Sequence, residues 1–178
     1  DDVLPFPWET CMSLGDSWSY VENDNYKSTN TIIHILIDVV AKGGNYLLNV
    51  GPDATGEFPA VAVQRLKEIG EWMKINGDAI YDTRPVPPYF NDRFRFTQKD
   101  GRVFVHYLLD ENETMPSSIA VPDDALSLIS SKNINTRPLK LKVLGGAKAE
   151  LRKSDNGYVI DIKGKINLKH AIVFEIKK

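Results

Sequence analysis

Glu9 is the carboxylate in this sequence whose neighbours favour acid–base chemistry. It lies between Trp8 and Thr10, and an apolar or aromatic neighbourhood raises the pKa of a carboxyl group. A carboxyl group kept protonated in this way can donate a proton to a leaving group and later take one back, which is general acid–base catalysis. On the sequence alone, the more ordinary interpretation of Glu9 is a solvated loop carboxylate or a local salt-bridge partner.

The cysteine and the histidines do not indicate a metal site. Cys11 is the single cysteine, so a disulfide within the chain is impossible and the paired spacing of a zinc site is missing. His34 falls within a predicted helix, whereas His106 and His170 belong to the later, strand-rich part without a cluster of partner ligands. We therefore expect neither a metal nor a cofactor.

The composition is that of an ordinary globular protein and excludes some partners. The 178 residues include 22 basic and 24 acidic side chains, with a net charge of −2. Nucleic-acid-binding proteins usually carry a clustered basic face, so we expect no nucleic-acid partner. We also expect no membrane span, because no stretch approaches the roughly 18 apolar residues that a span needs. The first residues, Asp1–Pro5, lack an initiator Met and a secretory signal, so we expect a longer chain.

The first half of the sequence predicts an α/β unit. The first 27 residues have no sustained period, which indicates a long loop, and such loops are usually functional. Apolar residues at helical spacing predict helices over 29–42 and 60–75. Between them, the apolar run Asn45–Val50 ends at Gly51 and predicts a strand buried on both faces. Helix, buried strand, loop and helix make up the repeating unit of a parallel α/β fold.

The second half predicts an antiparallel β domain. A proline-rich stretch, 83–88, breaks the helical pattern and predicts a linker between domains 1–82 and 89–178. Alternating strands flank Asp100-Gly101 and Asn156-Gly157, which are strong hairpin signals. With further strands around Ile119–Val121, Leu139–Leu144 and Ala171–Ile176, about seven short strands are expected, as in an antiparallel β-sandwich with its own core.

Four runs of residues carry a resemblance to a known family. They occur in the same order over the first part of the chain: Pro7–Tyr20, Lys42–Pro52, Arg65–Trp72 and Asn76–Tyr81. Together they closely resemble glycoside hydrolase family 29, the α-L-fucosidases. Ser19 departs from the family pattern, which usually has Gly between the Trp and the Tyr. After Pro88 only the architecture is similar.

The resemblance implies a fold and a reaction. Members of the family have a (β/α)8-like barrel followed by a β-sandwich, so this chain is expected to be the C-terminal end of such a barrel plus the sandwich. They hydrolyse terminal α-L-fucose with retention, using an Asp nucleophile and usually a Glu acid/base. A barrel needs about 250 residues, so the nucleophile and the remainder of the barrel are expected outside this chain. The family also suggests a periplasmic, secreted or lysosomal location.

The resemblance also implies roles for particular residues. Glu9 aligns with the acid/base of at least some members. Trp8 and Trp18 offer large flat surfaces on which a sugar could stack, and Tyr20 is a weaker candidate of the same kind. Asn49 and Gly51, where the buried strand ends, resemble positions near the fucose site. The competing interpretations are ordinary loop packing for the aromatic residues and a turn that closes the barrel for Asn49.

Two functions of other classes compete with the enzyme. The chain could be a non-catalytic carbohydrate-binding β-sandwich module, although such a module does not account for the α/β segment before residue 80. Alternatively, the β domain could simply buttress the barrel. The partner expected in the leading interpretation is a fucosylated oligosaccharide, bound as substrate.

Overall fold

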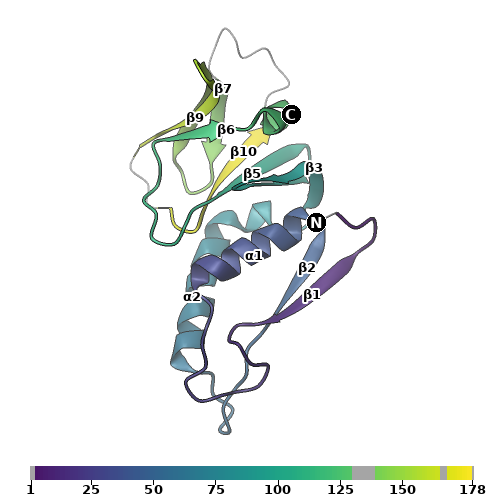
Figure 1. The fold of residues 1–178 in the computed structure, drawn as a ribbon, viewed down its shortest axis with the longest axis vertical. Coiled ribbons are helices and arrows are strands. Elements are labelled where there is room, and N and C mark those ends of the chain that lie inside the picture. Colours follow the sequence, from purple (N-terminus) through teal and green to yellow (C-terminus); the bar gives the residue numbers. More distant parts are fainter. Residues whose placement is uncertain (1–2, 130–138, 165–167, 178) are drawn as a thin grey trace.

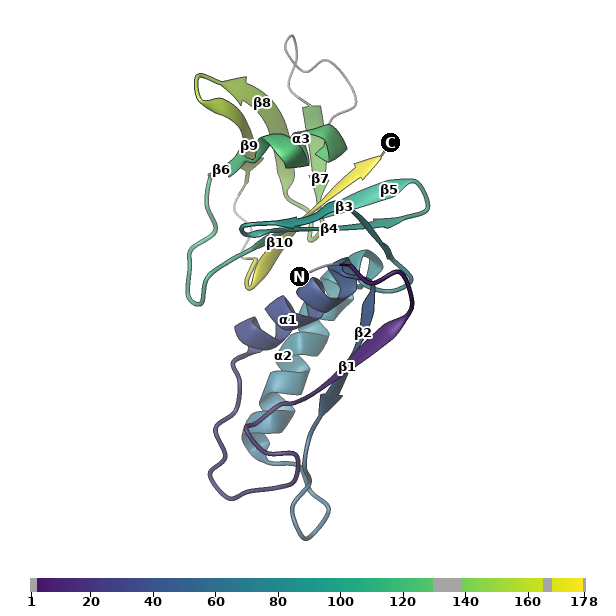
Figure 2. The same ribbon diagram turned by 45° about the vertical axis from the view of Figure 1, so that its right-hand side comes forward.

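The computed structural model describes residues 3–129, 139–164 and 168–177 in two parts (Figure 1). Asp1 and Asp2, the first residues of the sequence, lie outside the described residues. The first part is a small α/β unit, and the second is a sheet that stands against the helices of the first (Figures 1 and 2).

The α/β unit contains two parallel strands joined by a helix. Strand β1 (Trp8–Ser13) pairs with β2 (Gly44–Asn49), and helix α1 (Thr29–Ala41) connects them. Helix α2 (Ala60–Asn76) and a 3-10 turn, η1 (Gly77–Ala79), follow. The hydroxyl group of Ser28 caps α1 by accepting the N–H of Thr31, which satisfies one of the free donors at a helix start.

Strand β1 corrects the expectation that the first 27 residues form a loop. Its backbone partner, β2, follows only after α1. A parallel strand depends on a distant partner for its hydrogen bonds, and a short strand within a polar, aromatic segment leaves no periodic signal. The predicted helices and the strand from Asn45 are found within one residue of their expected limits. The strand is not buried on both faces as predicted, because Asn45 and Leu47 are exposed on the face that no other element of this chain covers.

The two faces of the β1–β2 pair differ in their cover. Tyr46 and Leu48 pack into a small core with Leu14 and Ile32, on the side of the helices. The opposite face carries Glu9, Cys11, Asn45 and Leu47, which are exposed. The register places Glu9 beside Asn45 and Cys11 beside Leu47. The described residues therefore form two parallel strands covered on one face, and a closed barrel is not part of this chain.

The second part is a mostly antiparallel, eight-stranded sheet. Its strands are β3 (Arg84–Asn91), β4 (Phe94–Lys99), β5 (Arg102–Leu108), β6 (Ser118–Val121), β7 (Leu139–Val143), β8 (Lys148–Ser154), β9 (Gly157–Lys163) and β10 (Ala171–Lys177), with helix α3 (Asp123–Ile129) between β6 and β7. Their order in the sheet is β3-β4-β5-β10-β7-β8-β9-β6. Both predicted hairpins are present, as β4–β5 and β8–β9.

The sheet folds over its own core, which gives it the layered form of a sandwich although it is one continuous sheet. Figure 2 shows β6 to β9 above the layer of β3, β4 and β5. Side chains of both layers meet in one cluster, where Phe96, Val105 and Phe174 pack with Leu151 and Ile160, all fully buried. The expected all-β domain is therefore present, with β10 connecting the two layers.

The outer face of β5 and β10 packs against the helices of the α/β unit. Ile33 and Ile37 of α1 and Trp72 of α2 form a second buried cluster with Phe104 and Val173 of the sheet. Because both faces of these two strands are buried, their sequences are apolar almost throughout. The sheet therefore has one core of its own and a second that it shares with the helices.

The stretch expected to be a linker, 83–88, contains the start of strand β3. Thr83 is buried and donates its hydroxyl to the carbonyl of Ile80, while Val86 joins the core of the sheet. Strand β3 is the outermost strand of the sheet, and an edge strand tolerates prolines because one side of its backbone needs no partner. The division into domains 1–82 and 89–178 stays a prediction.

Candidate functional site

The carboxyl ends of β1 and β2 are the natural place for a site in this fold. Ligands of parallel α/β proteins bind where strands end, at the loops that follow. Ser13 and Asn49 are the last, paired residues of the two strands, and the N–H of Leu14 donates to the carbonyl of Asn49 over 2.8 Å. Two loops leave from here, one leading to α1 and the other to α2.

Three of the residues predicted to bind substrate meet at this end. The amide nitrogen of Asn49 donates to the carbonyl oxygen of Trp18 over 2.7 Å. Gly51 lies so close to the loop that a Cβ there would stand 2.5 Å from the backbone nitrogen of Tyr20. Trp18 is 60% exposed and Tyr20 43% exposed. The strand end thus holds two aromatic side chains in solvent.

Trp8 is placed differently. Its indole N–H donates to the carbonyl of Lys42 over 3.2 Å, and its ring lies directly over Gly44, where a Cβ would approach ring carbons to 2.5 Å. Trp8 therefore packs against the chain between α1 and β2, at the opposite end of the strands from Trp18. This arrangement favours the packing interpretation that the sequence left open.

Glu9 lies in a strand rather than in a loop over the carboxyl face. It is the second residue of β1 and is exposed, and the sulfur of Cys11 lies 3.8 Å from one of its carboxylate oxygens. Strand residues rise about 3.3 Å each, so Glu9 stands about 13 Å from Ser13 along the strand. The structure therefore does not bring Glu9 together with Trp18, Tyr20 and Asn49.

Sequence reasoning did not identify the residues that hold the aromatic loop. The carboxylate of Asp24 accepts backbone N–H groups from Asp16, Ser17 and Asn25, and the ammonium group of Lys27 donates to two backbone carbonyls near the end of β1. Aspartate and asparagine commonly bond to nearby backbone in turns. That signal was present in the run Asn23-Asp24-Asn25.

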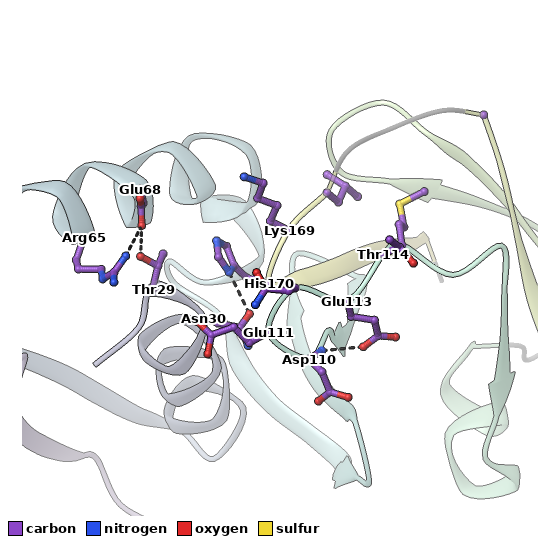
Figure 3. A pocket seen from close by; sticks show the side chains of 14 residues that line it. Thr29, Asn30, Arg65, Glu68, Asp110, Glu111, Glu113, Thr114, Lys169 and His170 are labelled. Carbon is purple, nitrogen blue, oxygen red and sulfur yellow. Dashed lines mark hydrogen bonds and ion pairs between the residues drawn. The ribbon is translucent and has the colours of Figure 1, made fainter. Parts of the chain in front are cut away.

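A hollow of about 750 Å³ lies away from the strand ends, at the junction of the helices and the sheet (Figure 3). On its helix side, Glu68 accepts hydrogen bonds from Thr29 and Arg65. The bond from Thr29 is the largest of the effects that lower the pKa of Glu68. His170 bonds to Asn30 through Nδ1 over 3.0 Å. The bonds of Glu68 stay within the helices α1 and α2, whereas the bond between His170 and Asn30 joins α1 to the segment that precedes β10. The hollow therefore lies where the two parts of the structure pack together.

Metal and membrane sites are not found among the described residues. Residues 3–129, 139–164 and 168–177 contain no group of three or more His, Cys, Asp or Glu side chains placed to hold a metal ion. Within the same ranges, no helix combines the length and the apolar character needed to cross a membrane.

The sequence matches known α-L-fucosidases. Residues 1–78 match the family model described as Alpha-L-fucosidase. The tissue α-L-fucosidase of Rattus norvegicus is 32% identical over 143 residues, which is 78% of this chain and 29% of that protein. The α-L-fucosidase of Dictyostelium discoideum is 44% identical over 81 residues, 44% of this chain and 18% of that protein. The chain thus spans well under half the length of these curated relatives.

Solved structures show the same likeness in fold. The α-L-fucosidase isoenzyme 1 from Paenibacillus thiaminolyticus has a TM-score of 0.75 and 30% identity over 97% of this chain and 40% of that one. The α-fucosidase of Thermotoga maritima, solved in complex with fucose, has a TM-score of 0.75 and 28% identity over 98% of this chain and 40% of that one.

The matches agree on the class of protein and on the family that this chain resembles. All the relatives named above are fucosidases, so the class of protein that this chain resembles is the glycoside hydrolases. Within that class, its sequence and its fold match the C-terminal portion of the α-L-fucosidases of family 29. The resemblance stated from the four sequence runs is confirmed.

Proposed function

We propose that this chain is part of an α-L-fucosidase that hydrolyses terminal α-L-fucose from glycans with retention, through a covalent intermediate. The observation that carries the proposal is the match of residues 1–78 to the fucosidase family, because this range contains the strand ends and the aromatic loop. The similarity to a fucosidase solved with fucose bound supports the same substrate class. A carbohydrate-binding module is not favoured, because it does not explain the α/β unit.

The α/β unit is proposed to be the end of a (β/α)8-like barrel. The helices cover one face of the β1–β2 pair, and the other face leaves Leu47 51% exposed. Neither strand pairs with a third strand among the described residues. Open strand edges and an uncovered apolar side chain are features that further parallel strands would cover in a barrel. The remainder of the barrel is therefore the expected structural partner.

The chemistry requires two carboxyl groups about 5–5.5 Å apart, one as nucleophile and one as acid/base. The nucleophile is proposed to lie in the remainder of the barrel. Glu9 is proposed as the acid/base because of the family resemblance. Its side chain is on the face that would line the barrel, but four residues before the strand end. The leaving-group dependence of a Glu9→Ala variant tests this role directly.

The proposal is tested with the full-length protein that contains this chain. It should hydrolyse 4-nitrophenyl α-L-fucoside, and proton NMR should show α-L-fucose as the first product because retention preserves the anomeric configuration. The 178-residue chain alone should not turn the substrate over, since the nucleophile is expected elsewhere. Absence of turnover by the full-length protein overturns the proposed function. Turnover by the chain alone overturns the proposed place of the nucleophile.

A further inference from the structure

The loop that carries Trp18 and Tyr20 is closed at its base. It leaves β1 after Ser13 and returns to α1 at Ser28. Between these ends lies the segment Trp18–Tyr20, which we call the tip, with the side chains of Trp18 and Tyr20 60% and 43% exposed. Large aromatic side chains held in solvent gain little from burial, so contacts of their own do not explain why this loop keeps its shape. Other residues must hold it.

Asp24 joins the two ends of the loop. Its carboxylate accepts the N–H groups of Asp16 and Ser17, at 3.3 Å each, from the outgoing side. It also accepts the N–H of Asn25, at 2.9 Å, on the returning side. The carboxylate sits against the backbone of Gly15, where a Cβ would lie 2.2 Å from Asp24 Oδ2. A single carboxylate thus fastens both sides of the loop base.

Lys27 adds a second connection at the base of the loop. Its Nζ donates to the carbonyl oxygens of Ser13 and Gly15, at 2.9 Å each. The hydroxyl of Ser13 donates to the same carbonyl of Gly15 over 2.6 Å. These charged donors and acceptors bind backbone groups rather than each other. Hydrogen bonds with one ionised partner are stronger than neutral ones. These bonds therefore fix the backbone where the loop leaves β1 and where it returns to α1.

The tip of the loop is fastened separately to β2. Asn49 donates to the carbonyl of Trp18, and the missing side chain of Gly51 leaves room for the backbone of Ser19 and Tyr20. Backbone atoms cannot rotate away as a side chain can, so a methyl group at Gly51 would push the tip away from the strand end. The loop is therefore held at its base by Asp24 and at its tip by Asn49 and Gly51.

We infer that Asp24 is a positioning residue for the fucosidase reaction, which holds Trp18 and Tyr20 at the strand end where they contact the sugar. The inference rests on the proposed function. Asp24 itself does not touch substrate. It acts through the loop, and removal of its bonds should weaken sugar binding even when the protein remains folded.

The variant Asp24→Asn in the full-length protein tests the role with little change in size. The amide nitrogen cannot accept an N–H, so the base of the loop loses at least one of its three bonds. We expect kcat/KM for 4-nitrophenyl α-L-fucoside to fall about 10-fold or more, mainly through a higher KM, because misplaced binding groups cost up to about 10²-fold. Glu22→Gln is the matched control, since it makes the same change of charge on the same loop, at an exposed residue.

A double-mutant cycle with Trp18→Ala decides whether Asp24 acts through the aromatic loop. Trp18→Ala alone should raise KM, and Asp24→Asn should add little in that background. The inference is wrong if Asp24→Asn leaves KM unchanged, or if it lowers only kcat because less of the protein is folded. It is also wrong if Asp24→Asn raises KM by the same factor with Trp18 and with Ala at position 18. It is equally wrong if Trp18→Ala has no effect on KM. In each of these cases an active wild-type protein leaves the proposed function standing.

A third variant keeps the test valid if Asp24→Asn does not fold. Gly51→Ala displaces the same loop from the β2 side, and its expected signature is the same rise in KM. The methyl group meets backbone atoms, so a lower thermal midpoint is also expected and the rise in KM is measured on the folded protein. The effect on KM should likewise disappear in the Trp18→Ala background. A Gly51→Ala protein with wild-type KM would overturn the positioning role of the loop.

Discussion

Glu9 is the residue at which the mechanism can be tested most directly. In retaining hydrolysis the acid/base first protonates the leaving oxygen and then deprotonates the incoming water. Glu9→Ala in the full-length protein should slow cleavage of natural fucosides by about 10²–10⁴-fold. Aryl fucosides with acidic leaving groups should lose much less in the first step. Azide, which needs no base, should attack the covalent β-fucosyl intermediate, restore turnover and yield α-fucosyl azide, with the same retention as the hydrolysis.

The alternative for Glu9 gives a different pattern. A carboxylate that only stabilises β1 should cause similar losses for good and poor leaving groups, without azide rescue. Its exposed position four residues before the strand end makes this a real alternative. Glu57→Ala, on the exposed loop after β2, is the control. Similar losses for good and poor leaving groups without azide rescue would assign the acid/base role to a residue outside this chain. The proposed fucosidase function would remain intact.

His106 is a second residue with a measurable signature, in this case on stability. It is fully buried, and its Nε2 lies 3.1 Å from the hydroxyl of Thr97, which donates its own proton to the carbonyl of Ala79. Nε2 must therefore carry the ring proton, and Nδ1 has no hydrogen-bond partner among the residues that the structure describes. Burial lowers the pKa of His106 from 6.5 to about 3. The folded protein thus holds this histidine neutral.

The sign of the pH effect follows from this difference in protonation. Below pH 6.5 the unfolded chain binds a proton at His106 that the folded protein does not bind, so stability falls as the pH drops toward about 3. The slope from this one group approaches about 1.4 kcal/mol per pH unit. Urea midpoints between pH 7 and 4 should decline less steeply for His106→Gln than for the wild type. Equal slopes would contradict the assignment of a neutral, buried His106.

At the scale of the elements, Asp38 fastens helix α1 to the sheet. Its carboxylate oxygens lie 2.5 Å from Nε of Arg95 on β4 and 2.9 Å from Nζ of Lys42. Both cations also lie over the ring of Phe90 on β3. Burial opposes ionisation of Asp38, but the hydrogen bonds from Lys42 and Arg95 outweigh it and lower its pKa. The group is therefore ionised in the folded protein at neutral pH.

Asp38→Asn should destabilise the protein by about 1–2 kcal/mol at pH 7, because it replaces charge-assisted bonds by neutral ones. Because the pKa of Asp38 is lower in the folded protein, its contribution to the free energy of unfolding is fully present above the unfolded pKa, near 4. That contribution is lost as the pH falls below this value. The difference in urea midpoint from the wild type should thus persist from pH 7 to 5 and shrink below pH 4. Asp92→Asn, an exposed position on the nearby turn, is the matched control. A penalty as large for the control would refute the role of the bridge.

At the scale of the whole molecule, the two cores bear on the predicted domain boundary. The cluster with Phe96 and Leu151 belongs to the sheet alone, whereas Phe104 and Val173 pack against the helices. Residues 83–178, which retain all of β3, should fold cooperatively because the first core is complete. Removal of the helices exposes the second cluster, so this piece should be less stable than the same region in the whole protein.

Thermal unfolding and the amide spectrum of residues 83–178 provide the measurement. A dispersed spectrum and a single cooperative transition are expected. Replacement of Phe104, which faces the lost helices, by Thr should improve solubility with little loss of stability, while Phe96→Ala should cost several kcal/mol. A disordered spectrum for residues 83–178 would show that the sheet depends on the helices and that the two-domain division is wrong.

The sequence by itself determined the elements whose signals are local. Helical spacing from Thr29 and from Ala60, and the turns at Asp100-Gly101 and Asn156-Gly157, were sufficient because helix periodicity and hairpin turns are encoded by nearby residues. The four family-like runs also identified the fucosidases before the fold was known. Only tertiary structure decided the placement of β1, whose partner β2 is distant in the chain.

Tertiary structure also separated residues that looked equivalent in the sequence. Trp8 and Trp18 both fall in an aromatic segment, yet Trp8 packs over Gly44 while Trp18 stands exposed at the strand end. Asp24 lies in a polar stretch of the same segment, and only the folded loop gives its carboxylate three backbone partners. The physical reason is that burial and long-range hydrogen bonds depend on which segments meet in space, and no local pattern of residue types contains that information.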